Sequence, residues 1–276
     1  MRHPDPSTNP GAGLLTQLRS ALYMLWLIVT VVPYAVAALL LSLVLRGRPL
    51  YRFCVGWPWL AVHGARRICG VDWRLHGVEN LPEGPAIVLA KHQSAWETLA
   101  LPLLLPRALS YVFKRELLWV PFFGWALGRL DMVHIDRSRG TQAFGRLQRQ
   151  GSNLLELGYW IVMFPEGTRT SRGAQGQYKL GGAKLAKVLD VPVIPVAVTS
   201  ARCWPRQAFV KRPGIIDVSI GPAILPGDYS AAELNARVQQ WIEAEMRRLD
   251  PQAYAHESAG QTAQAEPAES AQPPRP

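Results

Sequence analysis

Cysteine is scarce in this chain, and the few cysteines present are not arranged to do chemistry. Of 276 residues only three are cysteine, and Cys54, Cys69 and Cys203 form no C-x-x-C pair. Their spacing indicates neither a disulfide framework nor a metal site, and the six histidines are too scattered for a recognisable set of metal ligands. We therefore expect reduced, structural cysteines and no metal, which suits a protein whose main body faces the cytosol.

Two catalytic signatures are also absent. The sequence contains no Gly-x-x-x-x-Gly-Lys-Ser/Thr loop, which would cradle nucleotide phosphates. It also contains no Gly-x-Ser-x-Gly elbow, which would present a nucleophilic serine. The first absence argues against phosphate-loop chemistry and the second against the common serine hydrolases. Nothing in the sequence implies a cofactor.

Acidic residues are few relative to basic ones, and the net charge is +10. Residues 107–149 hold eight Lys or Arg against three acids, and residues 169–212 hold nine against one. A basic surface serves nucleic acid, anionic lipid or an acidic protein partner, and a generic solvated face has the same composition. The apolar segment described next favours lipid over nucleic acid.

Charge is missing altogether from residues 21–45, which are long enough to cross the hydrocarbon core of a bilayer. A cleavable signal peptide is disfavoured, because the run is too long and the sequence after it, Arg46-Gly47-Arg48-Pro49, does not suit cleavage. Pro33 should kink a helix here or divide it in two. The sequence therefore leaves open a single membrane helix or a helical hairpin that dips into one leaflet.

Arginines follow this apolar run more densely than they precede it. Arg46, Arg48 and Arg52 come directly after it. This bias predicts an inner (cytoplasmic) membrane protein whose catalytic body lies on the cytoplasmic face. A second apolar patch, residues 53–65, contains two tryptophans and is too short to span a membrane. It suits the headgroup level, and a buried core segment is the alternative.

Short apolar stretches alternate with helical ones after Gly70, which is typical of an α/β domain. The expected strands are 71–76, 86–90, 109–113, 132–135, 159–164, 193–199 and 215–220, and the expected helices are 139–157, 182–189 and 230–249. Residues 1–13 and 251–276 lack apolar runs, so we expect them to be disordered. Between them, residues 14–68 should anchor the protein in a membrane, and residues 69–250 should form the catalytic domain.

A first motif follows the expected strand 86–90 and reads Lys91-His92-Gln93-Ser94-Ala95-Trp96-Glu97. Its Ser-x-x-Glu pattern fits a capping box, in which Glu97 bonds back to the Ser94 amide at the start of a helix. The same carboxylate can also accept the imidazole N–H of His92, which would fix its tautomer and raise its basicity. The motif therefore predicts a capped helix, a general base, or both.

A second motif follows the expected strand 159–164 and reads Phe164-Pro165-Glu166-Gly167-Thr168-Arg169. Proline stiffens the exit from the strand, and glycine lets the backbone turn closely. Arg169 then offers the fork of N–H donors that suits a phosphate group. On its own, a strand-to-loop turn with a surface arginine explains this pattern equally well.

Together the motifs resemble those of the glycerolipid acyltransferases, and most of all the bacterial lysophosphatidate (1-acyl-sn-glycerol-3-phosphate) acyltransferases. That family carries four blocks in order, and this chain matches them at 92–97, 128–137, 164–169 and 191–195. Two minor blocks match at 113–117 and 179–183, and the resemblance covers about residues 71–221. The chain departs from the family at Glu97, where Asp is commoner, and at Lys91, where Asn is common. Glutamate keeps the charge of aspartate but adds a methylene.

The resemblance implies a fold, an activity and a set of site residues. The fold is a glycerolipid-acyltransferase-type α/β domain with a central mostly parallel or mixed sheet flanked by helices. The activity is acyl transfer from acyl-CoA or acyl carrier protein to the 2-hydroxyl of 1-acyl-glycerol 3-phosphate, which gives phosphatidate. The implied catalytic residues are His92 as base and Glu97 as its orienter. The implied substrate-binding residues are Arg137, Phe164, Pro165, Glu166, Gly167, Thr168, Arg169 and, more weakly, Lys114.

Other functions remain open at this stage. Within the family the acceptor could be glycerol 3-phosphate or a lyso-aminolipid, because the binding residues overlap. A membrane-bound lipid hydrolase would use His92 to activate water, but the missing serine elbow and the phosphate clamp disfavour it. A non-enzymatic, basic membrane adaptor is the third alternative, and it would bind anionic lipid without needing His92.

Overall fold

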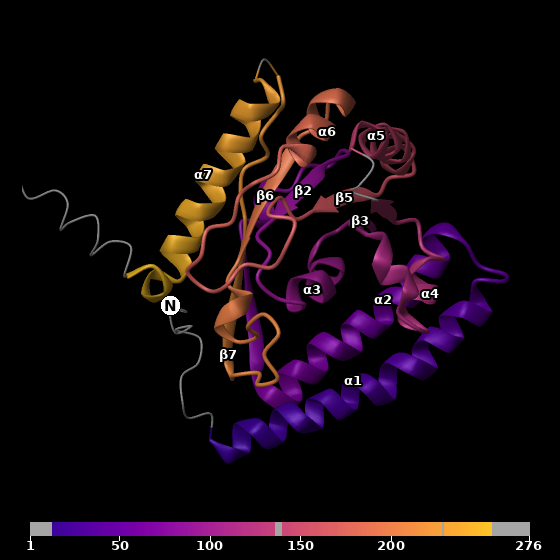
Figure 1. Ribbon diagram of the computed structural model, residues 1–276, viewed down its shortest axis with the longest axis vertical. Helices are drawn as coiled ribbons and strands as arrows, with labels where there is room; N and C mark the ends of the chain where they lie inside the picture. The colour runs from indigo at the N-terminus through magenta and orange to yellow at the C-terminus, as the bar shows by residue number, and fades with distance from the viewer. Residues whose placement is uncertain (1–12, 136–139, 228, 256–276) are drawn as a thin grey trace, which may run out of the picture.

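The computed structural model describes residues 13–135, 140–227 and 229–255, and its centre is one seven-stranded sheet (Figure 1). The strand order is β1-β7-β6-β2-β5-β3-β4. All neighbouring strand pairs in the described residues are parallel except β6 with β7. The strands are β1 Val71–His76, β2 Ile87–Ala90, β3 Leu109–Lys114, β4 Val133–Ile135, β5 Trp160–Met163, β6 Val193–Val198 and β7 Gly214–Ile220. The predicted α/β fold with a mixed sheet is confirmed.

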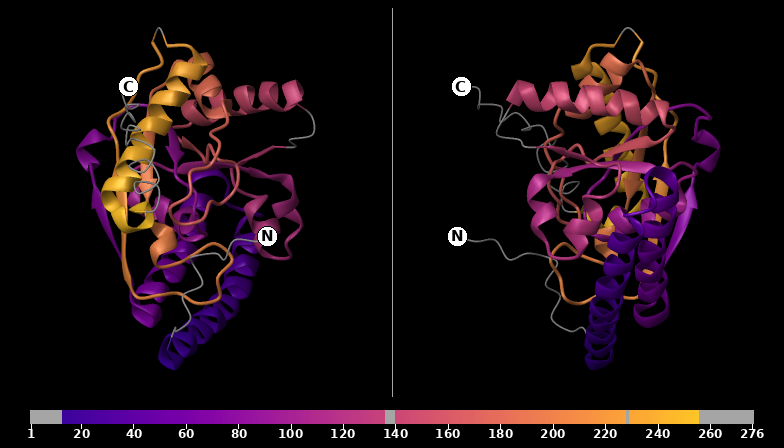
Figure 2. Two further views of the ribbon diagram at one scale, coloured as in Figure 1. Left: turned by 60° about the vertical axis from the view of Figure 1, so that its left-hand side comes forward. Right: turned by 90° about the vertical axis from the view of Figure 1, so that its right-hand side faces the viewer.

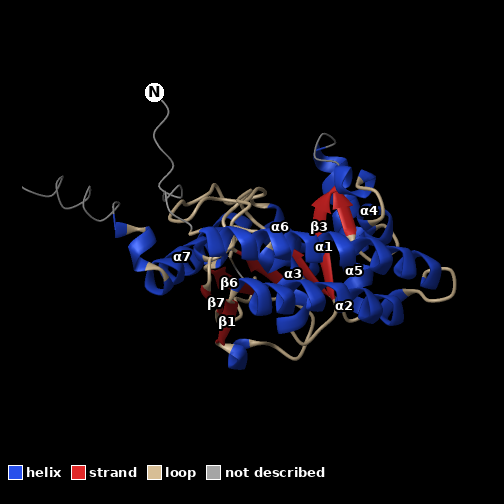
Figure 3. Cartoon of the chain, turned by 90° about the horizontal axis from the view of Figure 1, so that it is seen from below, coloured by secondary structure: helices blue, strands red, loops and turns tan. Residues whose placement is uncertain are grey.

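Helices cover both faces of the sheet (Figures 1 and 3). On one face lie α5 (Gly140–Glu156), α6 (Gly181–Leu189) and α7 (Ala231–Leu249), and on the other lie α2 (Gly47–Gly64) and α3 (Trp96–Leu104). With helices on both faces, β2 and β6 are wholly buried, and β2 is apolar along its whole length. This burial explains why the central strands were recognisable as continuous apolar runs.

The apolar N-terminal segment forms α1 (Leu14–Leu41), which packs antiparallel to α2 as a helical hairpin (Figure 2). Three side chains of α1 donate hydrogen bonds to carbonyls of α2: Tyr23 to Ala61, Trp26 to Leu60 and Tyr34 to Phe53. Of the described helices, α1 is the one long and apolar enough to cross a membrane. Most of its large apolar side chains are exposed.

Pro33 does not divide this helix, contrary to one of the two outcomes predicted for it. Proline removes one backbone hydrogen bond. Contacts with α2 hold α1 on both sides of that position, through Trp26 before it and Tyr34 after it. The helix therefore continues as one element.

The second apolar patch belongs to α2, and the alternative of a buried core segment holds for part of it. Ala61 and Val62 are buried against the body, as expected for a core segment. Trp59 is 51% exposed, and its place at the headgroup level stays a prediction. The reason is the position of α2, which lies between α1 and α3 and presents different residues to its neighbours and to the surroundings.

The packed body extends slightly beyond the predicted boundary at residue 250. A 3₁₀ turn at Pro251–Ala253 follows α7, and the Tyr254 side chain is buried in the core. The part of the predicted tail from 251 to 255 is therefore structured, because one aromatic side chain secures it. The predictions for residues 1–12 and 256–276 lie outside the described residues.

Close packing of the hairpin yields a stability prediction. A methyl group at Gly56 would overlap the Tyr34 hydroxyl, which donates to the carbonyl of Phe53. We expect Gly56→Ala to lower the free energy of unfolding by about 1–3 kcal/mol through overpacking, although alanine favours helix. Thermal unfolding in detergent, followed by circular dichroism, measures this.

Gly145→Ala is the matched control, because Gly145 also lies in a helix but nothing is within 4 Å of the added methyl. We expect this variant to be as stable as the wild type or more stable by up to about 1 kcal/mol. Equal effects of the two substitutions would contradict the packing argument.

Candidate active site

Parallel pairing of β2 with β5 places the two motifs beside each other. Leu89 of β2 is the register partner of Met163 of β5. Both strands end there, so the loops that begin at Lys91 and Phe164 leave the same edge of the sheet. Open α/β sheets bind their ligands at this edge, beyond the carboxyl ends of the strands.

Glu97 holds the first motif together and orients His92. Its Oε1 lies 2.9 Å from His92 Nδ1 and accepts the backbone amides of Gln93 and Ser94, each at 2.7 Å. The carboxylate is wholly buried, whereas the His92 side chain is 13% exposed. The His92 Nδ1–H therefore donates to a fixed acceptor, and Nε2 is directed away from the carboxylate, where it is able to take a proton.

The predicted capping box is half formed. Glu97 bonds back to the Ser94 amide as predicted, but the Ser94 hydroxyl accepts from the amide of Trp96 rather than that of Glu97. Helix α3 begins at Trp96. One carboxylate thus caps the first turn and orients the imidazole, so the two predicted roles of Glu97 coexist.

Aromatic rings support the imidazole from one side. The Phe164 ring stacks on His92 with centroids 3.9 Å apart and planes 16° apart. Tyr111 of β3 lies on the same stack, 6.2 Å from Phe164. Burial raises the pKa of Tyr111, and electrostatic interactions with Tyr51 and Glu97 add to this effect, so its hydroxyl stays protonated. Tyr111 was missed in the sequence because an aromatic residue inside a strand carries no signal of a site.

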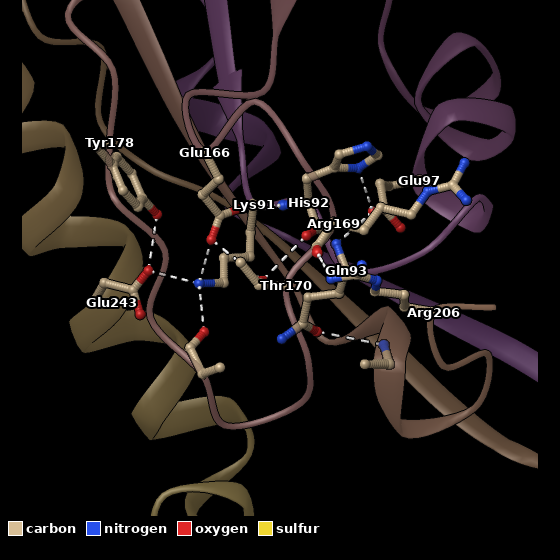
Figure 4. A network of polar contacts seen from close by, with 12 residues as sticks. Lys91, His92, Gln93, Glu97, Glu166, Arg169, Thr170, Tyr178, Arg206 and Glu243 are labelled. Atoms are coloured by element: carbon tan, nitrogen blue, oxygen red, sulfur yellow. Dashed lines mark hydrogen bonds and ion pairs between the residues drawn. The ribbon is translucent and has the colours of Figure 1, made fainter. Parts of the chain in front are cut away.

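The second motif binds the backbone of the first. Glu166 Oε2 accepts the amide N–H of His92 at 2.8 Å (Figure 4). Thr170 donates both its amide and its hydroxyl to the carbonyl of His92, at 2.8 and 3.1 Å. Gly167 has a φ of 68°, in the left-handed region that glycine adopts without strain. That turn lets Glu166 and Thr170 reach the same residue.

A buried ionic cluster lies behind the motifs (Figure 4). Lys91 Nζ is 2.7 Å from Glu166 Oε1 and 2.7 Å from Glu243 Oε1 of α7, and none of the three side chains is more than 4% exposed. Tyr178 donates its hydroxyl to Glu243 at 2.9 Å. Burial raises the pKa of Glu166, opposed by the charge and hydrogen bond of Lys91. Glu243 was missed in the sequence because it lies far along the chain from both motifs, and Tyr178 was missed because a single tyrosine in a loop carries no signal of a site.

The predicted basic residues are brought together only in part. Arg169 lies next to the His92 loop, and its carbonyl accepts a hydrogen bond from Arg206 at 2.7 Å. Lys114 is exposed at the end of β3, on the next strand beyond β5. Arg137 lies outside the described residues. Arg206 was not predicted, because a lone surface arginine resembles many others in this basic chain.

A second ion-pair cluster secures the loop after the second motif. Arg172 donates two hydrogen bonds to Asp250 at 2.7 and 2.8 Å, and Arg202 donates a third at 3.2 Å. Asp250 follows α7 directly and its side chain is buried. Burial raises the pKa of Asp250, but the hydrogen bonds and charges of Arg172 and Arg202 outweigh burial and leave it below its usual value.

This shift predicts how stability depends on pH. Because the pKa of Asp250 is lower in the folded state, its ion pairs stabilise the fold above the unfolded pKa, about 3.9. That contribution is lost as the pH falls through the folded value. We expect Asp250→Asn to lower the melting temperature at pH 7, with a difference from wild type that shrinks below about pH 4. A difference that is constant across this range would contradict the assignment.

Comparisons with known proteins agree with this geometry. A family model described as acyltransferase matches residues 72–199, which contain both motifs. A 1-acyl-sn-glycerol-3-phosphate acyltransferase of Pseudomonas aeruginosa is 39% identical over 238 residues, covering 85% of this chain and 92% of the relative. A protein of the same name from Saccharomyces cerevisiae is 31% identical over 54% of this chain and 51% of the relative.

The fold also has a counterpart among solved structures. The crystal structure of the 1-acyl-sn-glycerophosphate acyltransferase from Thermotoga maritima superposes with a TM-score of 0.70 at 23% identity, over 85% of this chain and 98% of that one. At this identity the likeness concerns the fold. With the paired motifs, the matched family model and a full-length relative in agreement, the chain belongs to the acyltransferase family.

Proposed function

We propose that this protein transfers a fatty acyl group to the 2-hydroxyl of a 1-acyl-glycerol 3-phosphate and so forms phosphatidate. The observation that carries the proposal is the imidazole of His92, held at 2.9 Å by the buried carboxylate of Glu97 at the ligand-binding edge of the sheet. The names of the Pseudomonas and Saccharomyces relatives support the choice of acceptor.

In this mechanism the acceptor hydroxyl is itself the nucleophile, so no acyl-enzyme forms. His92 Nε2 removes the hydroxyl proton while the oxygen attacks the thioester carbonyl of acyl-CoA or acyl carrier protein. The tetrahedral intermediate collapses and expels the thiolate, and His92 donates to it the proton that came from the acceptor hydroxyl. Glu97 stabilises the imidazolium between these steps, and the rings of Phe164 and Tyr111 keep its plane fixed.

The acceptor phosphate is assigned to the basic residues at the same edge. Arg169 is the main candidate, because the hydrogen bonds of Thr170 to His92 place it next to the base. Arg137 and Lys114 are proposed as further phosphate or thioester contacts. Arginine suits a phosphate because its fork of donors matches two phosphate oxygens.

We also propose that the hairpin of α1 and α2 anchors the body, residues 69–250, at the cytoplasmic face of the inner membrane. Support comes from the exposed apolar side chains along α1 and from the arginines that follow it. Trp119 and Trp125 near α4 (Phe123–Leu127) are also exposed, and α4 packs against α1. An anchored body would let the acyl chains of acceptor and product stay in lipid.

The first test is acyl transfer by purified protein in mixed micelles, with lysophosphatidate and either acyl-CoA or acyl carrier protein. We expect phosphatidate from the wild type, and a loss of about 10²–10⁴ in kcat for His92→Ala, the usual contribution of a general base. Glu97→Gln should lose at least about tenfold, because its neutral amide stabilises the imidazolium less well. Mass spectrometry identifies the product.

Circular dichroism of both variants provides the control for folding. Equal rates for wild type and His92→Ala would exclude His92 as the base. Failure of the wild type to acylate lysophosphatidate, while it acylates glycerol 3-phosphate or a lyso-aminolipid, would move the protein to another acceptor within the family.

Arg169 is tested by its effect on acceptor binding. We expect Arg169→Gln to raise the KM for lysophosphatidate about tenfold or more, since a charge-assisted contact contributes about 1.5–3 kcal/mol. The KM for the acyl donor should change little. The control is Arg74→Gln on the exposed face of β1, an edge strand of the sheet, which should leave both constants unchanged. An unchanged acceptor KM in the Arg169 variant would place the phosphate elsewhere.

A further inference from the structure

We infer that Lys91 and Glu243 are positioning residues for this reaction, through a buried ionic bridge by which the C-terminal helix α7 fixes the backbone of His92. The inference rests on the proposed function, because it assigns these residues to the same site. It also assigns the Glu166 side chain to this buried bridge and not to binding of the acceptor phosphate.

The bridge begins at α7 and ends at the base. Glu243 of α7 is 2.7 Å from Lys91 Nζ, and Lys91 Nζ is 2.7 Å from Glu166 Oε1. The other oxygen of Glu166 accepts the amide of His92 at 2.8 Å. Figure 4 shows these contacts as one continuous set of dashed lines. A helix about 150 residues further along the chain is thus connected to the catalytic loop by charged hydrogen bonds.

Burial makes this bridge rigid. The side chains of Lys91 and Glu166 are 0% exposed and that of Glu243 is 4% exposed. A buried charge is costly unless it is paired and hydrogen-bonded, so each member of the bridge holds the others in place. Lys91 gains a further acceptor in the carbonyl of Ala174 at 3.1 Å, and Tyr178 donates to Glu243. Few alternative arrangements keep these same hydrogen bonds, and Glu243 Oε2 is the bridge oxygen that has no partner among the described residues.

Lys91 acts through the backbone and not on substrate. Its ammonium group contacts Glu166 and Glu243, on the opposite side of the loop from the imidazole of His92 in Figure 4. Its charge holds the Glu166 carboxylate in the orientation that accepts the His92 amide. The imidazole must stay within hydrogen-bonding distance of Glu97 and reach the acceptor hydroxyl, and a misplacement of 1 Å costs about 10²-fold in rate.

The kinetic test compares Lys91→Met with Glu243→Ala and Glu243→Gln. Methionine keeps the length of lysine but removes its charge, and alanine removes the contact from α7. We expect each of these two variants to lose about 10–100-fold in kcat, while the KM for lysophosphatidate changes by less than about threefold. Glu243→Gln keeps an oxygen that accepts from Lys91 and Tyr178, so its kcat should stay within about threefold of wild type.

Ser230→Ala is the matched control. It removes the capping box with Glu233 in the first turn of α7, but Ser230 has no contact with the bridge or with the two motifs that the structure describes. The assays are run well below the melting temperature of every variant, so that a lower kcat reports a misplaced His92 and not unfolded protein. We expect the control to lose melting temperature while its kcat stays at the wild-type value.

Hydrogen exchange gives a second readout that does not need activity. The His92 amide is bonded to Glu166, and the Thr170 amide is bonded to the carbonyl of His92. We expect peptides that contain these two amides to exchange about tenfold faster or more in Lys91→Met and Glu243→Ala than in wild type, and not in Ser230→Ala. This outcome would support the bridge even if the wild type failed to acylate lysophosphatidate.

Three outcomes would overturn the inference. One is a kcat for Lys91→Met and Glu243→Ala equal to that of Ser230→Ala. Another is a raised KM at unchanged kcat, which would mean that the residues act on substrate binding. The last is a fall in kcat with unchanged exchange at His92 and Thr170. Should Lys91→Met fail to fold, the contrast between Glu243→Ala and Glu243→Gln decides the same question.

Discussion

β2 and β5 lie side by side and run in the same direction, so the loops that leave their carboxyl ends start from one edge of the sheet. This pairing brings Lys91 to Glu97 beside Phe164 to Arg169, although about 70 residues of chain separate them. Helices cover both faces of the sheet, so the two strands are apolar throughout and the polar residues gather beyond their ends. The candidate site depends on this arrangement more than on any single side chain.

Two buried carboxylates hold different parts of His92. Glu97 accepts hydrogen bonds from the imidazole and from two amides of its own loop, so it fixes the orientation of the ring. Glu166, in the second motif, accepts a hydrogen bond from the His92 amide, so it fixes the position of the His92 backbone. A hydrogen bond to an ionised group is stronger than one between neutral groups, which explains why charged residues do both tasks in the interior. The ammonium group of Lys91 neutralises the charge of the Glu166 carboxylate, which it contacts at 2.7 Å.

The hairpin of α1 and α2 joins the body through packing and not through a flexible linker. Hydrogen bonds from Tyr23, Trp26 and Tyr34 hold the two helices together, and α2 packs against α3, the helix that begins just after His92. The exposed apolar face of α1 therefore has a fixed direction relative to the site. A membrane that receives this face would meet the edge of the sheet that carries the candidate site in one orientation.

The sequence by itself determined the α/β class and the positions of the strands, because apolar periodicity is a local property. Its first motif predicted that Glu97 caps a helix, accepts the imidazole N–H of His92, or does both, and the structure shows both contacts. The sequence did not determine the strand order, the hairpin, or the contacts of Tyr111 and Tyr178. Nor could it show that Glu243 meets Lys91, since the two are 152 residues apart and a glutamate in an amphipathic helix looks like a solvated one. Such contacts exist only once the sheet has formed and α7 has packed on it, because burial is a property of the whole fold.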